Sequence, residues 1–200
     1  MKHLPLALIY SRLVIGLLLV LLAWAGAPHF AALAVGLITL GLLTDIFDGI
    51  IARQLNISTE KLRRLDSTVD QLFWLLVVGA AYLECRSFFS ENKWPLLTLL
   101  GLEGATYAVS FLKFRKEVAT HSWAAKLWVL ISFGALVQVM TTCQSGWLFA
   151  LCFYVGVVSR LEIVAILLLL RRWTNDVPTV YHALLLRQGK PIKRHKLFNG

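Results

Sequence analysis

The sequence has few charged residues for a chain of 200 residues. Charged side chains make up only 16% of it and hydrophobic side chains 58%, and the mean hydropathy is +0.70. These proportions exclude an ordinary soluble domain and indicate a polytopic membrane protein. A chain of this length makes one modest domain.

Cysteine is also scarce, and the three cysteines Cys85, Cys143 and Cys152 lack the spacing of a metal-ligand motif. We expect free buried thiols, although Cys85 and Cys143 share the predicted outer side of the membrane, which leaves a disulfide between them open. The sequence contains no internal repeat and no low-complexity tract. Its apolar N-terminus lacks a convincing cleavage site of small residues, so we interpret it as a retained first membrane helix rather than as a signal peptide.

Long apolar segments are abundant. Those that approach the roughly 20 residues needed to span a bilayer are residues 5–24, 30–51, 67–84, 95–112, 124–141 and 147–170. The predicted fold class is therefore all-α, a polytopic membrane protein of six transmembrane helices with an interfacial active-site cavity. We divide the chain into a membrane domain of residues 1–172 and a basic cytoplasmic tail of residues 173–200. In the tail, VYHALLLRQ is a possible interfacial helix, and the basic residues favour attraction to anionic lipid headgroups.

Basic residues are nearly absent from one side of the predicted helix bundle. If the helices alternate in direction, that side carries only Arg86 and Lys93. The opposite side carries the basic tail and Lys2, Arg53, Lys61, Arg63, Arg64, Lys113, Arg115 and Lys116. The positive-inside rule then places both termini and the loop near residue 60 in the cytoplasm.

Four aspartates flank that loop. Asp45 and Asp48 are three residues apart near the end of segment 30–51, and Asp66 and Asp70 are four residues apart near the start of segment 67–84. Each pair shares one face of its helix, and the two helices run antiparallel across a short loop. We therefore expect the four carboxylates to meet at one depth, just inside the cytoplasmic interface. Carboxylates at such a depth are costly and mark a functional site.

Uncompensated carboxylates would repel one another strongly, and divalent cations relieve this repulsion. Ligands that are all oxygen suit Mg²⁺ or Mn²⁺, and the absence of nearby cysteines or paired histidines argues against zinc. Two metals surrounded by acids suit phosphoryl transfer. Gly49 allows close approach to the helix backbone, and Arg53 is placed to contact a phosphate or to pair with an acid. Pairing of all four aspartates with Arg53, Arg63 and Arg64 in a solvated loop is the alternative; we disfavour it because Asp45 and Asp48 lie well inside an apolar segment.

These residues resemble the signature of the CDP-alcohol phosphotransferases, D-x2-D-G-x2-A-R-x8-G-x3-D-x3-D. Every position but one is matched at the family spacing, by Asp45, Asp48, Gly49, Ala52, Arg53, Asp66 and Asp70. The segment LDSTVDQL is similar to that of phosphatidylglycerophosphate synthases, and DVPTVYHALLLRQG resembles the tail of bacterial members. The resemblance spans nearly the whole chain.

The resemblance implies an assignment of roles. Asp45, Asp48 and Asp66 would ligate a pair of Mg²⁺ or Mn²⁺ ions, and Asp70 would be a further ligand or mainly the general base. The metals would hold the diphosphate of a CDP-linked lipid. Gly49, Ala52 and Arg53 would line the cytidine and phosphate site. Asp70 would take the proton of an acceptor alcohol, whose oxygen would attack the β-phosphorus and release CMP.

One position departs from the signature, because Leu62 stands where the family has glycine. In the family that glycine lets the nucleotide approach the backbone, so the leucine side chain would crowd the cytidine pocket. The substitution leaves three possibilities open: a shifted nucleotide pose, a different activated donor, or weakened activity.

Two arginines and a lysine lie inside apolar segments. Arg12 and Arg160 must face the bundle interior or a wet cavity at their depth. Each is a candidate contact for an acceptor phosphate, and the alternative is an internal pair with Glu103 or Glu162. Lys126 is a candidate for the same role, and for it the alternative is a side chain that snorkels to the interface.

The leading function is an integral membrane transferase of phospholipid biosynthesis that moves a phosphatidyl group from a CDP-linked lipid, such as CDP-diacylglycerol, to an alcohol. Glycerol 3-phosphate is the acceptor that we predict first, and other alcohols are alternatives. The alternatives are a divalent-cation transporter and a catalytically weak family relative with an assembly role. We expect no nucleic-acid partner. From the resemblance we expect a homodimer in a bacterial inner membrane.

Overall fold

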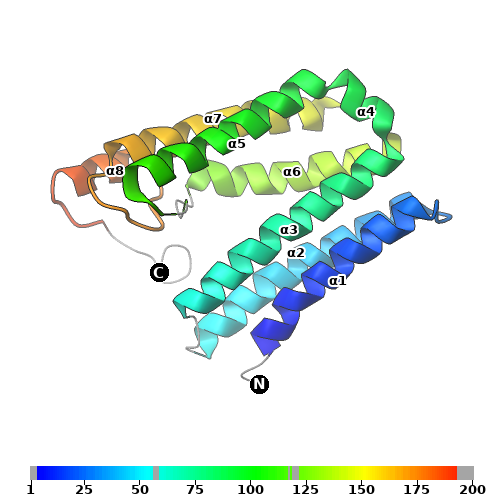
Figure 1. Cartoon of the computed structure of the whole chain (residues 1–200), viewed down its shortest axis with the longest axis horizontal. Helices are drawn as coiled ribbons and strands as arrows, with labels where there is room; N and C mark the ends of the chain where they lie inside the picture. Colours follow the sequence, from blue (N-terminus) through cyan, green and yellow to red (C-terminus); the bar gives the residue numbers. More distant parts are fainter. Residues whose placement is uncertain (1–3, 56–58, 117, 119–121, 193–200) are drawn as a thin grey trace. The chain divides into compact units, whose positions relative to one another are not determined.

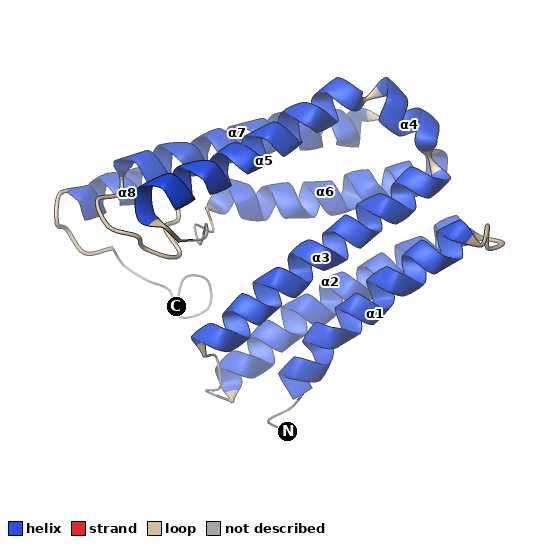
Figure 2. Ribbon diagram, viewed as in Figure 1, coloured by secondary structure: helices blue, strands red, loops and turns tan. Residues whose placement is uncertain are grey.

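The structure is a computed structural model, and it describes residues 4–55, 59–116, 118 and 122–192. For residues 53, 60, 61, 63 and 64 only the backbone is described. Every regular element in these ranges is helical, and the described residues contain no strand (Figure 2). The predicted all-α fold class is confirmed.

Five of the helices are long and apolar enough to cross a membrane, by length and composition. They are α1 (Leu4–Trp24), α2 (Phe30–Gln54), α5 (Lys93–Phe114), α6 (Trp123–Thr142) and α7 (Trp147–Leu169). The third predicted segment is part of α3 (Glu60–Glu84), which is also of spanning length. Asp66, Asp70 and Gln71 interrupt its apolar sequence, and α3 is not among the helices that are apolar enough to cross a membrane by composition. Two short helices, α4 (Arg86–Glu91) and α8 (Val180–Arg187), complete the described elements.

The chain forms two compact units, and the first comprises residues 1–89 and 139–144. In this unit α1 packs along both α2 and α3, as Figure 1 shows. The buried face of α1 follows helical spacing, with Pro5, Ile9, Arg12, Ile15, Gly16, Leu19 and Ala23. Arg12 is thus a charged residue in an otherwise apolar row.

Two glycines allow the three helices of the first unit to pack closely. A Cβ atom on Gly16 of α1 would lie 2.8 Å from Leu76 Cδ1 of α3, and one on Gly41 of α2 would overlap the ring of Phe73 of α3. Phe73 itself is buried. Larger side chains at either glycine would push α3 away. This packing fixes the position of the aspartates that α2 and α3 carry.

A disulfide joins Cys85, at the end of α3, to Cys143, directly after α6, and it lies within the first unit. The expectation of free thiols was therefore wrong for these two cysteines and is met only by Cys152, which is free and buried. The two helix ends bring the cysteine Cα atoms to 5.0 Å from each other, well within the range of a disulfide. The disulfide is the alternative that the shared outer side of the two cysteines had left open, although they are 58 residues apart in the sequence.

The second unit comprises residues 90–138 and 145–200. In this unit α5 packs against α7, and α7 packs against α8. Ile166 and Leu170 at the end of α7 form a buried cluster with Val177 and Ala183. The predicted tail helix is present as α8, and this cluster anchors it to α7.

Candidate active site

The two aspartate pairs are carried by α2 and α3, as the sequence predicts. Thr59 fixes the start of α3, because its side-chain oxygen accepts a hydrogen bond from the backbone N–H of Leu62 at 3.2 Å. Asp66 and Asp70 follow one and two turns later on the same helix face as Leu62. Leu62 is half-buried. Its side chain therefore shares a helix face with the carboxylates at the point where the family signature has glycine.

Arg12 of α1 is the centre of the cluster. Its side chain is fully buried, and Nη1 lies 2.8 Å from Asp45 Oδ1. Nη1 also contacts Asp70, and Nη2 contacts Asp48 and Asp66. One guanidinium from the first helix therefore touches all four carboxylates from the second and third helices.

Among the described side chains, the charges of the cluster do not balance. Arg12 supplies one positive charge against four carboxylates, and Asp48 is almost completely buried. The other three aspartates are about one third exposed and face an accessible side of the site. Arg12 Nε is buried and has no hydrogen-bond partner among the described residues. A site with this residual negative charge favours additional cations.

The donor set of the cluster fits a divalent cation. Asp45, Asp48 and Asp66 each present a carboxylate oxygen, and these atoms all lie within 4.8 Å of one another. Carboxylate oxygens are the ligands that Mg²⁺ and Mn²⁺ prefer. Asp70 joins the same cluster through its contact with Arg12.

The remaining residues of the signature lie on α2. Gly49 follows Asp48 directly, and Ala52 is buried one turn later. Arg53 is in α2, but its side chain lies outside the described atoms, as do those of Arg63 and Arg64. Both the predicted phosphate contact of Arg53 and the alternative pairing of the aspartates with these arginines therefore lie outside the described structure.

Arg160 and Lys126 belong to the second unit. Arg160 Nε contacts Glu103, and its guanidinium carbon lies 4.3 Å from the centre of the Trp128 ring. The internal pair with Glu103, weighed above as an alternative to phosphate binding, is thus present. Lys126 Nζ lies 5.4 Å from the ring centre of Trp123. A role of either residue toward an acceptor phosphate stays a prediction.

The sequence identified Arg12 as a candidate phosphate contact or a member of an internal ion pair, but it did not identify its partners. Glu103 and Glu162 were the acids proposed for it, whereas the structure places it against the aspartates. The available signal was depth. Arg12 lies about 12 Å along α1 from Leu4, and Asp45 lies about 14 Å along α2 from Gln54, so the two residues have similar depths on antiparallel helices.

The fold and the site define a class of protein. It is a membrane protein of several helices, with a cluster of aspartates suited to binding a phosphate group through metal ions. A family model for CDP-alcohol phosphatidyltransferase matches residues 2–168 of the chain. The chain therefore belongs to the CDP-alcohol phosphatidyltransferase family, whose reaction is the transfer of a phosphatidyl group from a CDP-alcohol. No curated protein and no solved structure gave a significant match. The similarity to phosphatidylglycerophosphate synthases in particular stays a prediction.

Proposed function

We propose that this protein is a metal-dependent transferase that moves the phosphatidyl group of CDP-diacylglycerol to an alcohol acceptor and releases CMP. The observation that carries the proposal is the convergence of the four aspartates on one point. Three of them offer carboxylate oxygens within 4.8 Å of one another, and the fourth reaches the same guanidinium. This donor set suits a diphosphate that is bound through divalent cations.

Asp45, Asp48 and Asp66 would hold Mg²⁺ or Mn²⁺, with Asp70 as a further ligand. When bound, the metal neutralises the charge of the diphosphate and of the departing CMP. Gly49 and Ala52 have small side chains, so the nucleotide can approach the backbone of α2 next to Asp48. Arg53 supplies a positive charge for its phosphates. The CDP moiety would therefore lie along the last turns of α2.

Asp70 is the proposed general base. It lies one turn deeper in the helix than Asp66, toward the lipid side, and its side chain is about one third exposed. Its carboxylate takes the proton of the acceptor hydroxyl, and the hydroxyl oxygen forms a bond to the β-phosphorus of the donor. The bond between that phosphorus and the bridging oxygen breaks, and the electron pair leaves with CMP.

Arg12 is a positioning residue in this proposal. It cross-links the acids of α2 to those of α3, since it contacts Asp45 and Asp48 on one side and Asp66 and Asp70 on the other. Without it, repulsion would drive the two helices apart before any metal arrived. Its guanidinium therefore preserves the geometry of the site in the absence of metal.

The acceptor we propose is glycerol 3-phosphate, with Arg160 and Lys126 as candidate contacts for its phosphate. For Arg160 this requires release from Glu103, a pair whose carboxylate is about one third exposed. Arg12, the third candidate from the sequence, is buried against the four aspartates and is assigned the positioning role instead. We further propose a homodimer, a membrane domain of residues 1–172 with a basic tail of residues 173–200, and both termini in the cytoplasm of a bacterium.

The disulfide supports this orientation. Cys85 and Cys143 lie at helix ends that the distribution of basic residues assigns to the outer side. Disulfides persist in oxidising compartments such as the periplasm and are rare in the cytosol. The aspartates lie near the opposite end of α3 from Cys85, and this end is the cytoplasmic one in the proposal.

The proposal is tested with purified full-length protein in detergent, CDP-diacylglycerol, Mg²⁺ or Mn²⁺, and a panel of alcohols that includes glycerol 3-phosphate. We expect CMP release that depends on both the metal and one acceptor. A well-folded protein that releases no CMP with any acceptor would contradict the proposal. Metal-dependent cation flux in liposomes without CMP release would instead indicate a transporter.

A further inference from the structure

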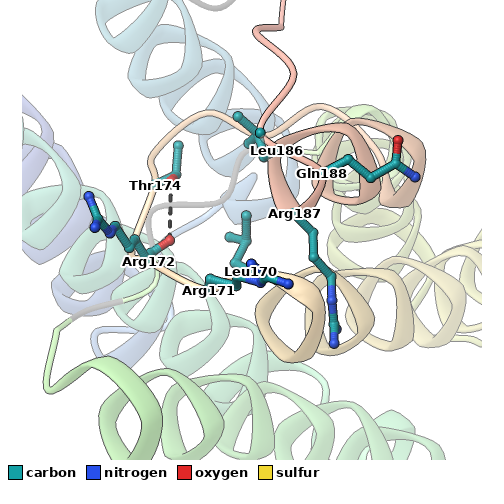
Figure 3. Close-up of a pocket in the computed structure, with 8 residues that line it drawn as sticks. Leu170, Arg171, Arg172, Thr174, Leu186, Arg187 and Gln188 are labelled. Carbon is teal, nitrogen blue, oxygen red and sulfur yellow. Dashed lines mark hydrogen bonds between the residues drawn. The ribbon is translucent and has the colours of Figure 1, made fainter.

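A second candidate site lies at the end of α7, apart from the residues assigned to catalysis. The segment after α7 and the end of α8 enclose an open cavity of about 500 Å³ in the second unit. Its lining includes Arg171, Arg172 and Arg187 together with the apolar side chains of Leu170 and Leu186. Figure 3 shows that Arg171 and Arg172 come from one wall and Arg187 from the other. A cavity of this size accommodates a small ligand or a lipid headgroup.

In the part of the chain that the structure describes, no acid pairs with these arginines. None of the ion pairs found among the described residues involves Arg171, Arg172 or Arg187. Asp176, the nearest acid in the chain, accepts a hydrogen bond from Asn175 at 3.1 Å. The cavity therefore concentrates positive charge.

The arginines are not needed to complete the helix ends either. Lys113 of α5 donates hydrogen bonds to the carbonyls of Leu167 and Leu168 in the last turn of α7, at 3.0 and 2.6 Å. At the end of α8, backbone N–H groups of residues 188–190 donate to the carbonyls of Leu184, Leu185 and Leu186. The two helix ends contribute roughly half a negative charge each, which is less than the charge of three guanidiniums.

The exposed face of α8 indicates that a ligand of the cavity would come from the membrane. Tyr181 is 65% exposed and Leu184 is 40% exposed, and Arg187 follows at the same spacing of three residues on the same helix face. An apolar stripe that ends in a basic residue is typical of helices that lie in the membrane interface. The cavity thus opens beside a surface suited to acyl chains.

We propose that this cavity binds the phosphate group of an anionic phospholipid. Arg171 and Arg187 supply charge-assisted hydrogen bonds to the phosphate oxygens, and the face formed by Tyr181 and Leu184 contacts the lipid chains. In Figure 3 the guanidinium of Arg172 points away from that of Arg187, so we assign it a weaker share. The site is independent of the proposed transfer reaction, because none of its residues belongs to the aspartate cluster.

The test uses full-length protein in detergent and phosphatidylglycerol with a fluorescent acyl chain as the probe, with phosphatidylcholine for comparison. The background is Asp70→Asn in every sample, so that failure of the transfer reaction does not affect the result. The test variant is Arg171→Gln/Arg187→Gln. The matched control is Arg86→Gln/Lys93→Gln, which removes the same charge from residues outside the cavity.

We expect phosphatidylglycerol to bind more tightly than phosphatidylcholine. The affinity should fall about thirtyfold in the test variant, since each arginine near an anionic lipid contributes roughly fivefold, and should be unchanged in the control. The single variant Arg187→Gln, whose side chain is exposed, should lose about fivefold. Unchanged affinity in both arginine variants would overturn the proposal.

The source of the phosphate is tested separately. Inorganic phosphate at equal concentration should not displace the lipid, and Tyr181→Ser/Leu184→Ser should weaken lipid binding several-fold. If inorganic phosphate displaces the probe as well as unlabelled lipid does, the site binds soluble phosphate and the lipid assignment is wrong.

Discussion

Arg12 Nη1 lies 2.8 Å from Asp45 Oδ1, a contact between residues that are 33 positions apart in the sequence. The arginine is fully buried, and the same guanidinium reaches the other three aspartates of the signature. The first helix thus takes part in the carboxylate site, although the family signature lies wholly on the second and third helices. This contact makes Arg12 the residue whose removal best tests the structure of the site.

Replacing Arg12 by glutamine should destabilise the protein by about 3–5 kcal/mol, because it leaves the buried Asp48 without its counter-charge. Mg²⁺ should restore part of this loss, so its addition should raise the Tm of Arg12→Gln more than that of the wild type. Thermal unfolding in detergent, with and without Mg²⁺, measures both effects. Arg86→Gln, at an exposed arginine, is the control and should behave like the wild type. Equal Tm values for Arg12→Gln and wild type in the absence of metal would contradict the role assigned to Arg12.

Replacing Leu62 by glycine should tighten binding of the nucleotide donor several-fold, because it removes a side chain from the helix face that carries Asp66 and Asp70. The change costs about 1 kcal/mol of helix stability, so the KM for CDP-diacylglycerol is the informative quantity. Leu75→Gly imposes the same helix cost at an exposed position of α3 on the face opposite Asp66. A KM unchanged by Leu62→Gly would show that Leu62 does not crowd the nucleotide. Activity that appears only in Leu62→Gly would indicate that the natural protein is a weak family relative.

The cysteines predict a simple labelling pattern. Under denaturing conditions without a reductant, a maleimide should label one thiol per chain, that of Cys152, because Cys85 and Cys143 are joined. After reduction it should label three. Loss of the disulfide should also lower stability by about 2–4 kcal/mol, measurable as a lower Tm for Cys85→Ala/Cys143→Ala. Labelling of three thiols before reduction would contradict the disulfide.

Variants of Arg160 and Glu103 can distinguish a purely structural ion pair from a role of Arg160 in binding the acceptor. If the pair only stabilises the second unit, the swap Glu103→Arg/Arg160→Glu should recover most of the Tm lost in Arg160→Gln, and the KM for the acceptor should match that of the wild type. If Arg160 also binds the acceptor phosphate, as we propose, the swap should recover Tm while the acceptor KM stays raised at least tenfold, the scale of a lost charged hydrogen bond. Recovery of both quantities would remove Arg160 from the acceptor site.

The sequence predicted most of what apolar length and local spacing determine. The helices appear where apolar segments were found, and Asp45, Asp48 and Asp66 meet because each pair keeps one helix face across a short connection. α3 was recognised as a helix of spanning length although its aspartates weaken its apolar character. Periodicity within a helix is a local property, so it can be read from neighbouring residues.

What the sequence did not predict depends on packing between distant segments. The contacts of Arg12 with the aspartates follow from how α1 packs along α2 and α3, and the cysteine pair follows from the ends of α3 and α6. The cavity at Arg171 and Arg187 requires α8 to fold back on α7 through the cluster of Ile166, Val177 and Ala183. None of these approaches has a signature in residue spacing. Several acids of the chain are also possible partners for a buried arginine, and only the fold determines which of them it contacts.

The central claim is that the four aspartates form one metal-dependent transfer site, and release of CMP from CDP-diacylglycerol tests it most directly. We predict that Asp45→Asn, Asp48→Asn, Asp66→Asn and Asp70→Asn each abolish Mg²⁺-dependent release while the protein remains folded. Asp176→Asn makes the same chemical change outside the cluster, at a residue with φ of 54° that asparagine tolerates, and should leave release intact. Full activity in any of the four aspartate variants, or release in the wild type that persists after all divalent metal is removed, would contradict the claim.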